Sequence, residues 1–234
     1  MLPKLATPKY DMIVPSTGEN ITYRPYVVKE EKILLIAIES QDEKQIESAI
    51  TRVIETCIDG DLKVKALTTF DIEFIFLTLR GKSVGEGIKL TMTCQDCETE
   101  NEVKVDLNKL QVKNNDFDKK DLQLKINDDI TIDLRWPTMS DRSTKIGDST
   151  TENLIHMVSK SIATLYNGEE VINLQETPFD EVLEFVESLS SPQFNSIMEV
   201  LVKTPYTSYD ILFDCKECKK KNERELKGLA DFFQ

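Results

Sequence analysis

Two Cys-x2-Cys pairs, far apart in the sequence, restrict what this 234-residue chain can fold into more than any other feature. Each pair ends a stretch in which apolar and polar residues alternate, as in a strand with one buried face. Beyond each pair the chain turns polar, and Asn followed by Glu stands at the same distance after the second cysteine. The sequence therefore contains a short internal repeat of strand, cysteine turn and strand. We call the two turns the first knuckle (Cys94–Cys97) and the second knuckle (Cys215–Cys218).

The two knuckles predict a structural zinc site. A tight turn between two cysteines places both sulfurs on one side of the backbone, where amides and nearby lysines offset the charge of the thiolates. Two such turns supply the four ligands of a tetrahedral zinc ion, at Zn–S distances of about 2.3 Å. A catalytic zinc keeps one position open, and four thiolates leave none. We therefore predict that a structural zinc ion fastens the end of the chain to its middle through Cys94, Cys97, Cys215 and Cys218.

Three other interpretations of the knuckles remain: a redox dithiol, a disulfide and a metal-free remnant. Redox Cys-x2-Cys motifs usually precede a helix that lowers the thiol pKa, whereas these lie between predicted strands. The odd number of cysteines, five, and the expected intracellular location disfavour disulfides. The fifth cysteine, Cys57, lies on the apolar face of a predicted helix and is interpreted as a core residue. One feature departs from common zinc knuckles, because Glu98 and Lys219 stand where a glycine often follows the second cysteine.

The charge balance limits the classes of partner. The chain has 42 Asp and Glu against 29 Lys and Arg, and its net charge of −13 opposes binding to nucleic acids and to anionic membranes. Its longest apolar runs fall well short of the roughly 18 residues of a membrane span. The N-terminus lacks the apolar core of a secretory signal, so we expect a soluble intracellular protein without a membrane span. The one basic cluster, residues 216–224, is interpreted as a solvated hairpin, since no aromatic residues interleave its lysines.

The sequence offers little for catalysis. His156, the single histidine, lies on the flank of an amphipathic segment and is interpreted as structural. There is no glycine-rich phosphate loop, no G-x-S-x-G and no H-E-x-x-H. We predict no enzymatic activity, no catalytic residue and no small-molecule substrate.

Residues 1–28 are predicted to form an extended N-terminal arm, because four prolines exclude a long helix. The arm is either a short hairpin on the domain or a segment that becomes ordered on a partner. It is the first candidate for a partner contact, since an extended segment can add a strand to a sheet edge. We expect its removal to abolish assembly and to leave the fold intact.

Residues 29–234 are predicted to form a single α+β domain, with helices packed around a small, mainly antiparallel sheet and a discontinuous zinc-ribbon-like pair of knuckles. Its parts are a helical segment (29–82), a strand-rich segment with the first knuckle (88–136), a second helical segment (150–203), and the second knuckle with the C-terminal tail (209–234).

Local signals predict where several helices begin and end. Asp42 is predicted to cap a helix that stops before Gly60, and the next helix is predicted to run from Thr69 to Gly81. Later helices are expected over 150–166, 178–189 and 192–203. The final Phe232-Phe233 either caps the core or docks on a partner.

The run from Ile21 to Ala37, ITYRPYVVKEEKILLIA, is similar to the opening of the baseplate hub subunit family of T-even-type bacteriophages. The chain length, the acidic helical segment, the central Cys-x2-Cys pair and the short helices near the end also fit, so the resemblance covers most of the chain. It implies a non-enzymatic structural or chaperone-like assembly protein of the central hub of a contractile tail. Its partners would be other hub or assembly proteins, in the virion baseplate or in the host cytoplasm during assembly.

The resemblance supplies no catalytic residue, and the four metal ligands rest on cysteine spacing alone. The alternative function is a zinc-ribbon protein that binds nucleic acid or acts in phage transcription. That alternative requires a basic face, and the net charge of −13 disfavours it.

Overall fold

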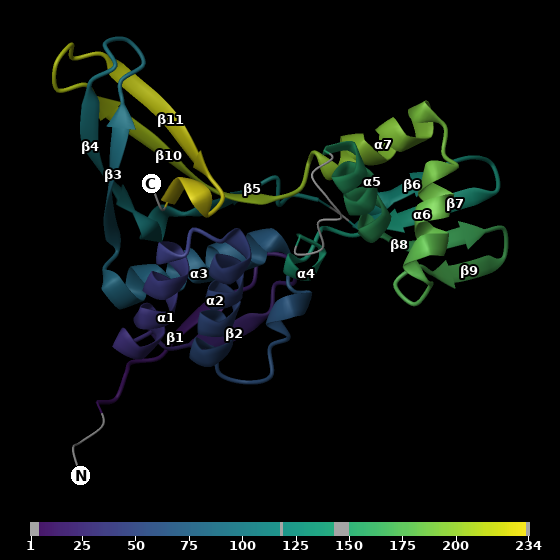
Figure 1. The fold of residues 1–234 in the computed structure, drawn as a ribbon, viewed down its shortest axis with the longest axis horizontal. Helices are drawn as coiled ribbons and strands as arrows, with labels where there is room; N and C mark the ends of the chain where they lie inside the picture. Colours follow the sequence, from purple (N-terminus) through teal and green to yellow (C-terminus); the bar gives the residue numbers. More distant parts are fainter. Residues whose placement is uncertain (1–4, 118, 143–149, 233–234) are drawn as a thin grey trace. The chain divides into compact units, whose positions relative to one another are not determined.

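The computed structural model describes residues 5–117, 119–142 and 150–232. Contacts between Cα atoms divide the chain into two compact units, shown in Figure 1. The first unit comprises Met1–Asn115 and Pro205–Gln234, and the second comprises Asp116–Thr204. The second unit is thus inserted within the first, where the sequence analysis groups residues 29–234 as one domain. The inserted segment contains its own sheet and helices, which accounts for the division.

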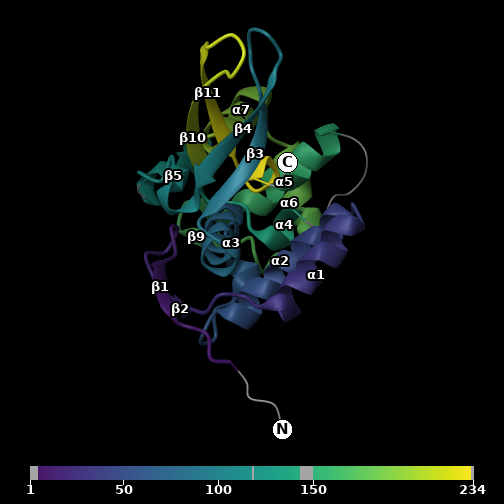
Figure 2. The ribbon, with the colours of Figure 1, turned by 90° about the vertical axis from the view of Figure 1, so that its left-hand side faces the viewer.

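The first unit combines a helical part with two long hairpins. Its strands pair antiparallel as β1–β2, as β3–β4 and as a three-stranded sheet in the order β11-β10-β5. Figures 1 and 2 show the β3–β4 and β10–β11 hairpins side by side. The elements are β1 (Tyr10–Ile13), β2 (Asn20–Tyr23), α1 (Val28–Glu39), α2 (Glu43–Cys57), α3 (Thr69–Val84), β3 (Gly87–Thr93), β4 (Glu100–Asp106), β5 (Gln111–Lys113), β10 (Tyr206–Asp214) and β11 (Lys221–Lys227), with short 3-10 turns at Val64–Ala66, Leu107–Lys109 and Ala230–Phe232.

Helix starts follow the sequence signals more closely than helix ends. The side chain of Asp42 accepts hydrogen bonds from two amides of the first turn of α2, as predicted. The predicted end of α3 at Gly81 is wrong, since the helix continues to Val84. Gly81 is buried within the helix, and a Cβ atom there would lie 3.4 Å from Cβ of Leu107. The glycine therefore serves close packing rather than termination.

The segment predicted as an arm forms a hairpin that belongs to the first unit. Residues of this hairpin are buried, among them Val14 at 0% exposure and Tyr23 at 2%. Ser16 donates from its amide (2.9 Å) and its hydroxyl (2.6 Å) to the buried carboxylate of Asp71 on α3. This packing argues against the expectation that residues 1–28 can be removed without damage to the fold, because the hairpin supplies core side chains and hydrogen-bonds to a buried carboxylate.

An apolar core joins the two long hairpins to α3. The residues at its centre are 0–9% exposed, and they come from α3, from both hairpins and from the 3-10 turns at Leu107–Lys109 and Ala230–Phe232. Phe232 is 1% exposed in this core, so the aromatic end of the chain caps it. Phe233 lies outside the described residues. The buried set is Leu77, Ile88, Leu90, Val105, Leu107, Ile211, Leu226 and Phe232.

The second unit is a four-stranded antiparallel sheet, in the order β6-β7-β8-β9, with helices. The predicted helix over 150–166 is wrong only over residues 162–166, because α5 ends at Ser161 and β8 follows at once. Pairing of β8 with strands on both sides supplies hydrogen bonds that local helical preference cannot match. The elements are β6 (Gln123–Lys125), β7 (Ile130–Leu134), α4 (Met139–Arg142), α5 (Thr150–Ser161), β8 (Ile162–Asn167), β9 (Glu170–Asn173), α6 (Phe179–Glu187) and α7 (Ser191–Leu201), after a 3-10 turn at Lys119–Leu122.

The α+β fold class is confirmed, with small antiparallel sheets accompanied by helices. Among the described residues, no helix combines the length and the apolar character needed to cross a bilayer.

Candidate metal centre

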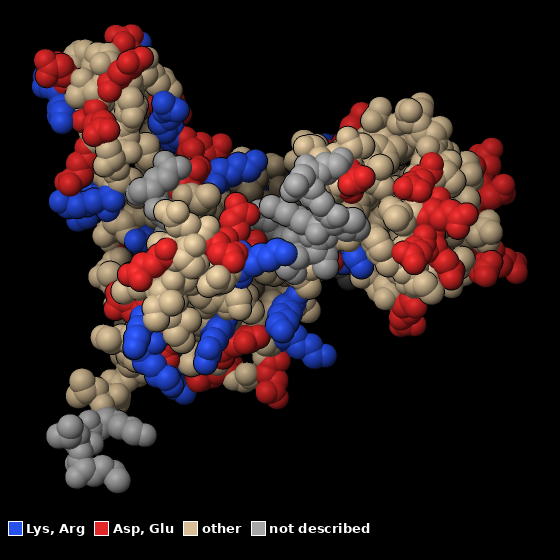
Figure 3. Space-filling view, in the orientation of Figure 1, with Lys and Arg blue, Asp and Glu red and all other residues tan. Residues whose placement is uncertain are grey.

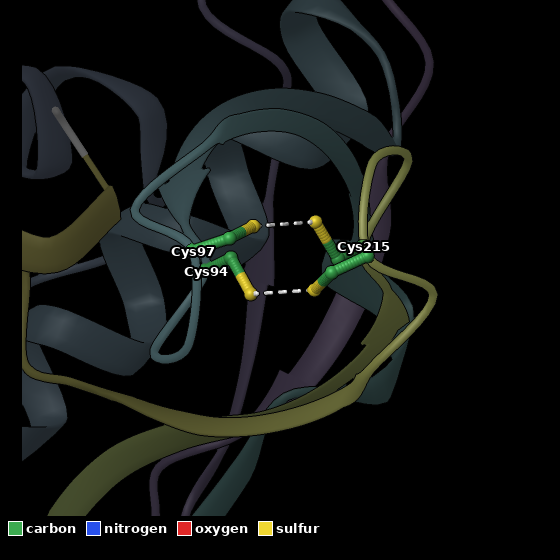
Figure 4. Close-up of side chains that lie close together, drawn as sticks. Cys94, Cys97 and Cys215 are labelled. Atoms are coloured by element: carbon green, nitrogen blue, oxygen red, sulfur yellow. Dashed lines mark hydrogen bonds between the residues drawn. The ribbon is translucent and has the colours of Figure 1, made fainter.

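The ends of the two long hairpins bring the four predicted ligands together. The first knuckle joins β3 to β4, and the second joins β10 to β11. Their sulfur atoms face one another across the hairpins, as Figure 4 shows for Cys94, Cys97 and Cys215. Sγ of Cys94 lies 3.7 Å from Sγ of Cys218, and Sγ of Cys97 lies 3.5 Å from Sγ of Cys215. All four sulfurs lie within 4.8 Å of one another.

These distances fit one tetrahedral metal ion. Four sulfurs at about 2.3 Å from a zinc ion lie about 3.8 Å from one another along the edges of the tetrahedron. The two closest sulfur pairs, at 3.7 and 3.5 Å, match this edge. They are far longer than the roughly 2.05 Å of a disulfide bond, and all four cysteines are free. The residues present therefore suit a structural zinc ion, which would cross-link the hairpins.

Both knuckles have the same backbone geometry. The amide of Cys94 donates to the carbonyl of Thr99 (2.9 Å), and the amide of Cys215 donates to the carbonyl of Lys220 (2.9 Å). Glu98 and Lys219, which follow the second cysteines, have φ angles of 56° and 58°. This left-handed conformation costs a non-glycine residue about 1–2 kcal/mol. This cost explains why glycine is common at this position. Here both knuckles adopt the left-handed conformation with a non-glycine residue.

Hydrogen bonds to sulfur prepare the cluster for a cation. The backbone amides of Cys97 and Asp96 lower the pKa of Cys94 to about 6. The amide of Lys220 also lowers the pKa of Cys218, but the neighbouring thiols and burial outweigh it and raise this pKa to about 12. Four thiolates this close repel one another, so their joint ionisation requires a positive charge between them.

Two buried asparagines connect each knuckle to the other. Asn222 of β11 donates to Sγ of Cys94 (3.5 Å) and accepts from the amide of Gln95 (3.0 Å). Asn101 of β4 donates to Sγ of Cys215 (3.8 Å) and accepts from the amide of Lys216 (2.8 Å). The cysteine spacing assigns no role to these two asparagines. The sequence feature that could have indicated this role is an Asn at the same distance after the second cysteine in both halves of the repeat.

The basic cluster of the second knuckle faces an acidic neighbour. Nζ of Lys220 lies 2.6 Å from Oδ1 of Asp96, with both side chains about half exposed. Such an exposed pair is screened by salt and contributes little to stability. The contact agrees with the interpretation of this cluster as a solvated hairpin beside an acidic one.

The two remaining candidates for chemistry, Cys57 and His156, are both buried. Cys57 is 1% exposed at the end of α2, and burial raises the pKa of its thiol to about 11. The ring of His156 is 6% exposed and packs 4.8 Å from the ring of Phe179. Burial lowers the pKa of His156; Lys160 lowers it further, and Asp141 opposes the shift. In the described part of the chain, neither residue belongs to a metal-binding cluster.

Protonation of His156 is expected to destabilise the protein. Its pKa in the folded chain lies below the unfolded value of 6.5, so the unfolded chain binds the proton first as the pH falls. The contribution to stability is complete above pH 6.5 and is lost as the pH falls through the lowered pKa. Urea unfolding between pH 7.5 and 5 should therefore show a smaller decrease for His156→Gln than for the wild type. Equal slopes in the two proteins would contradict this assignment.

The fold and the thiol cluster define a class of α+β protein in which the ends of two long hairpins meet at four free thiols that could hold a metal ion. The family model of the T4 bacteriophage base plate protein matches residues 7–234, and the chain belongs to this family. No curated protein and no solved structure matches the chain significantly. The chain is therefore a structural component of a phage tail baseplate, where it contacts other phage proteins. The resemblance noted in the sequence is confirmed at the level of a T4-type baseplate protein.

Proposed function

We propose that the protein is a non-enzymatic structural or chaperone-like assembly component of the central hub of the baseplate, acting through protein–protein contacts. A structural zinc ion, bound by Cys94, Cys97, Cys215 and Cys218, would join its two long hairpins. The observation that carries the zinc assignment is the set of four free thiols within 4.8 Å of one another. Membership of the baseplate family supports a role in protein contacts.

The hub assignment is supported by the segment that resembles hub subunits, which folds into β2, a short connection and α1. Helix α1 carries apolar side chains on its outer surface: Val28 is 78% exposed, Leu35 is 54% and Ile36 is 55%. Exposed apolar side chains on one helix are typical of a surface that a partner covers. We infer that α1 is a contact of the protein within the hub.

The distribution of charge disfavours the nucleic-acid alternative. On the face shown in Figure 3, basic and acidic side chains alternate over the first unit, and acidic side chains predominate on the second. Residues 161–202 contain no Lys, Arg or His. Binding to a phosphate backbone needs a concentration of positive charge, whereas contacts between proteins do not.

The location in the hub can be tested by fractionation of baseplate assembly intermediates. An affinity-tagged chain expressed during infection is expected to co-purify with central hub proteins rather than with peripheral baseplate proteins, as identified by mass spectrometry. Leu35→Glu should reduce the recovered hub proteins several-fold, because a charge on α1 opposes burial against a partner. The matched control is Val171→Glu on β9, which introduces the same charge at a side chain that is 62% exposed. Recovery with peripheral proteins alone would contradict the hub assignment, and equal effects of both variants would contradict the contact through α1.

A further inference from the structure

We propose that Asn101 and Asn222 hold the two knuckles together in the metal-free chain, so that a metal ion enters a site whose thiols are already gathered. The inference rests on the proposed metal site and assigns a positioning role to two residues that ligate nothing. It concerns the order of events, with the pairing of the hairpin ends preceding the binding of metal.

Each asparagine is aimed across the gap by its own hairpin. The side-chain amide of Asn101 donates to the carbonyl of Thr99 (2.7 Å), and that of Asn222 donates to the carbonyl of Lys220 (2.9 Å). Both carbonyls belong to the turn of the knuckle on the same hairpin as the asparagine. With the amide group fixed in this way, its oxygen faces a backbone amide of the opposite knuckle: Lys216 for Asn101 and Gln95 for Asn222.

The two hydrogen bonds between the hairpins are reciprocal, and both asparagine side chains are buried. Asn101 is 4% exposed and Asn222 is 2% exposed, so neither side chain can replace these partners with bulk water. Separation of the knuckles would break both of these hydrogen bonds. A hydrogen bond made by a buried side chain contributes more to stability than one that water can replace at the surface. Neither of these two hydrogen bonds between the hairpins uses a metal ligand.

The asparagines act where the apolar core no longer reaches. The core between the hairpins ends at the partly buried Met92 and Phe213, before the cysteines begin. Beyond these residues the exposed pair of Lys220 and Asp96 is a further contact across the gap, and it is weak. In the metal-free chain, the hydrogen bonds of Asn101 and Asn222 to the opposite knuckle are therefore the main polar connection between the ends of the hairpins.

Amide hydrogen exchange in the full-length chain, reduced and stripped of metal with a chelator, tests the proposal. The amides of Gln95 and Lys216 are expected to be protected in the metal-free wild type. Asn222→Ala should remove the protection of Gln95, and Asn101→Ala that of Lys216, although each substitution lies on the opposite hairpin. Glu223→Ala and Glu102→Ala alter the next residue on each hairpin at exposed positions and should leave both amides protected.

Metal binding provides a second measurement. Zinc affinity from competition with a chromogenic chelator should fall about 10- to 100-fold in Asn222→Ala, as for other residues that orient metal ligands. If Gln95 and Lys216 exchange freely in the metal-free wild type, the proposed pre-assembly is wrong, whether or not zinc binds. If both amides are protected and no zinc binds, the proposed role of the two asparagines is upheld and the proposed metal site is wrong.

Discussion

Replacing Cys215 with serine is expected to abolish zinc binding and to lower the melting temperature by about 10 °C, which corresponds to roughly 3–5 kcal/mol for a chain of this size. Cys215 is 0% exposed, and its sulfur lies 3.5 Å from Sγ of Cys97 on the opposite hairpin. A serine hydroxyl is a poor zinc ligand, and three remaining thiolates do not complete a structural site. Because metal binds the folded chain only, the loss of affinity appears as a loss of stability.

Two measurements on the same samples decide this prediction. Inductively coupled plasma mass spectrometry should find about one zinc per chain in the wild type, the number that four ligands can hold, and almost none in the variant. Differential scanning calorimetry should show the lower melting temperature. Cys57→Ala is the matched control, because it removes a buried thiol that does not belong to the cluster and should cost stability without loss of zinc. A wild type without zinc, or a Cys215→Ser variant that keeps its metal, would refute the zinc site.

Replacing Asp71 with alanine is expected to lower the free energy of unfolding by about 3–5 kcal/mol, since several half-buried donors lose a shared buried acceptor at once. Asp71 is 0% exposed. Its carboxylate accepts from the amide and hydroxyl of Ser16 (2.9 and 2.6 Å) and from the amide of Thr68 (3.1 Å). The substitution therefore breaks the cap of α3 and the connection to the N-terminal hairpin together.

Urea denaturation of the full chain measures this loss. Asp42→Ala is the matched control, because Asp42 also caps a helix but is exposed, so its loss should be much smaller. Asp71→Asn keeps one acceptor oxygen and should fall between alanine and the wild type. A stability of Asp71→Ala equal to that of Asp42→Ala would show that the buried network does not anchor the hairpin.

Local patterns in the sequence predicted most helices and strands that depend mainly on interactions between neighbouring residues. The apolar periodicity and the cap at Asp42 marked α2, and the alternation around the first knuckle marked β3 and β4. The failures occurred where distant partners decide the structure. Gly81 continues a helix because Leu107 packs against it, and β8 replaces a predicted helical turn because it pairs on both sides.

The cysteine spacing named four candidate ligands, and the structure gathers all four sulfurs within 4.8 Å. Spacing carries no information on which residues would orient them. Asn101 and Asn222 stood out only as an equal offset in a repeat, and their role depends on the opposite hairpin. The sequence likewise shows that Glu98 stands where a glycine is common, but its left-handed φ of 56° is a property of the folded turn.

The α+β class, the two knuckles and the likeness to a phage baseplate family follow from the amino-acid sequence alone, because composition, periodicity and short motifs are properties of neighbouring residues. The folded chain was needed to show that the N-terminal hairpin is part of the core, that residues 116–204 form a separate unit, and that Asn101 and Asn222 each accept a hydrogen bond from the opposite knuckle. Each of these depends on contacts between residues far apart in the chain. Such contacts are set by packing and by the pairing of buried polar groups, which no local pattern records.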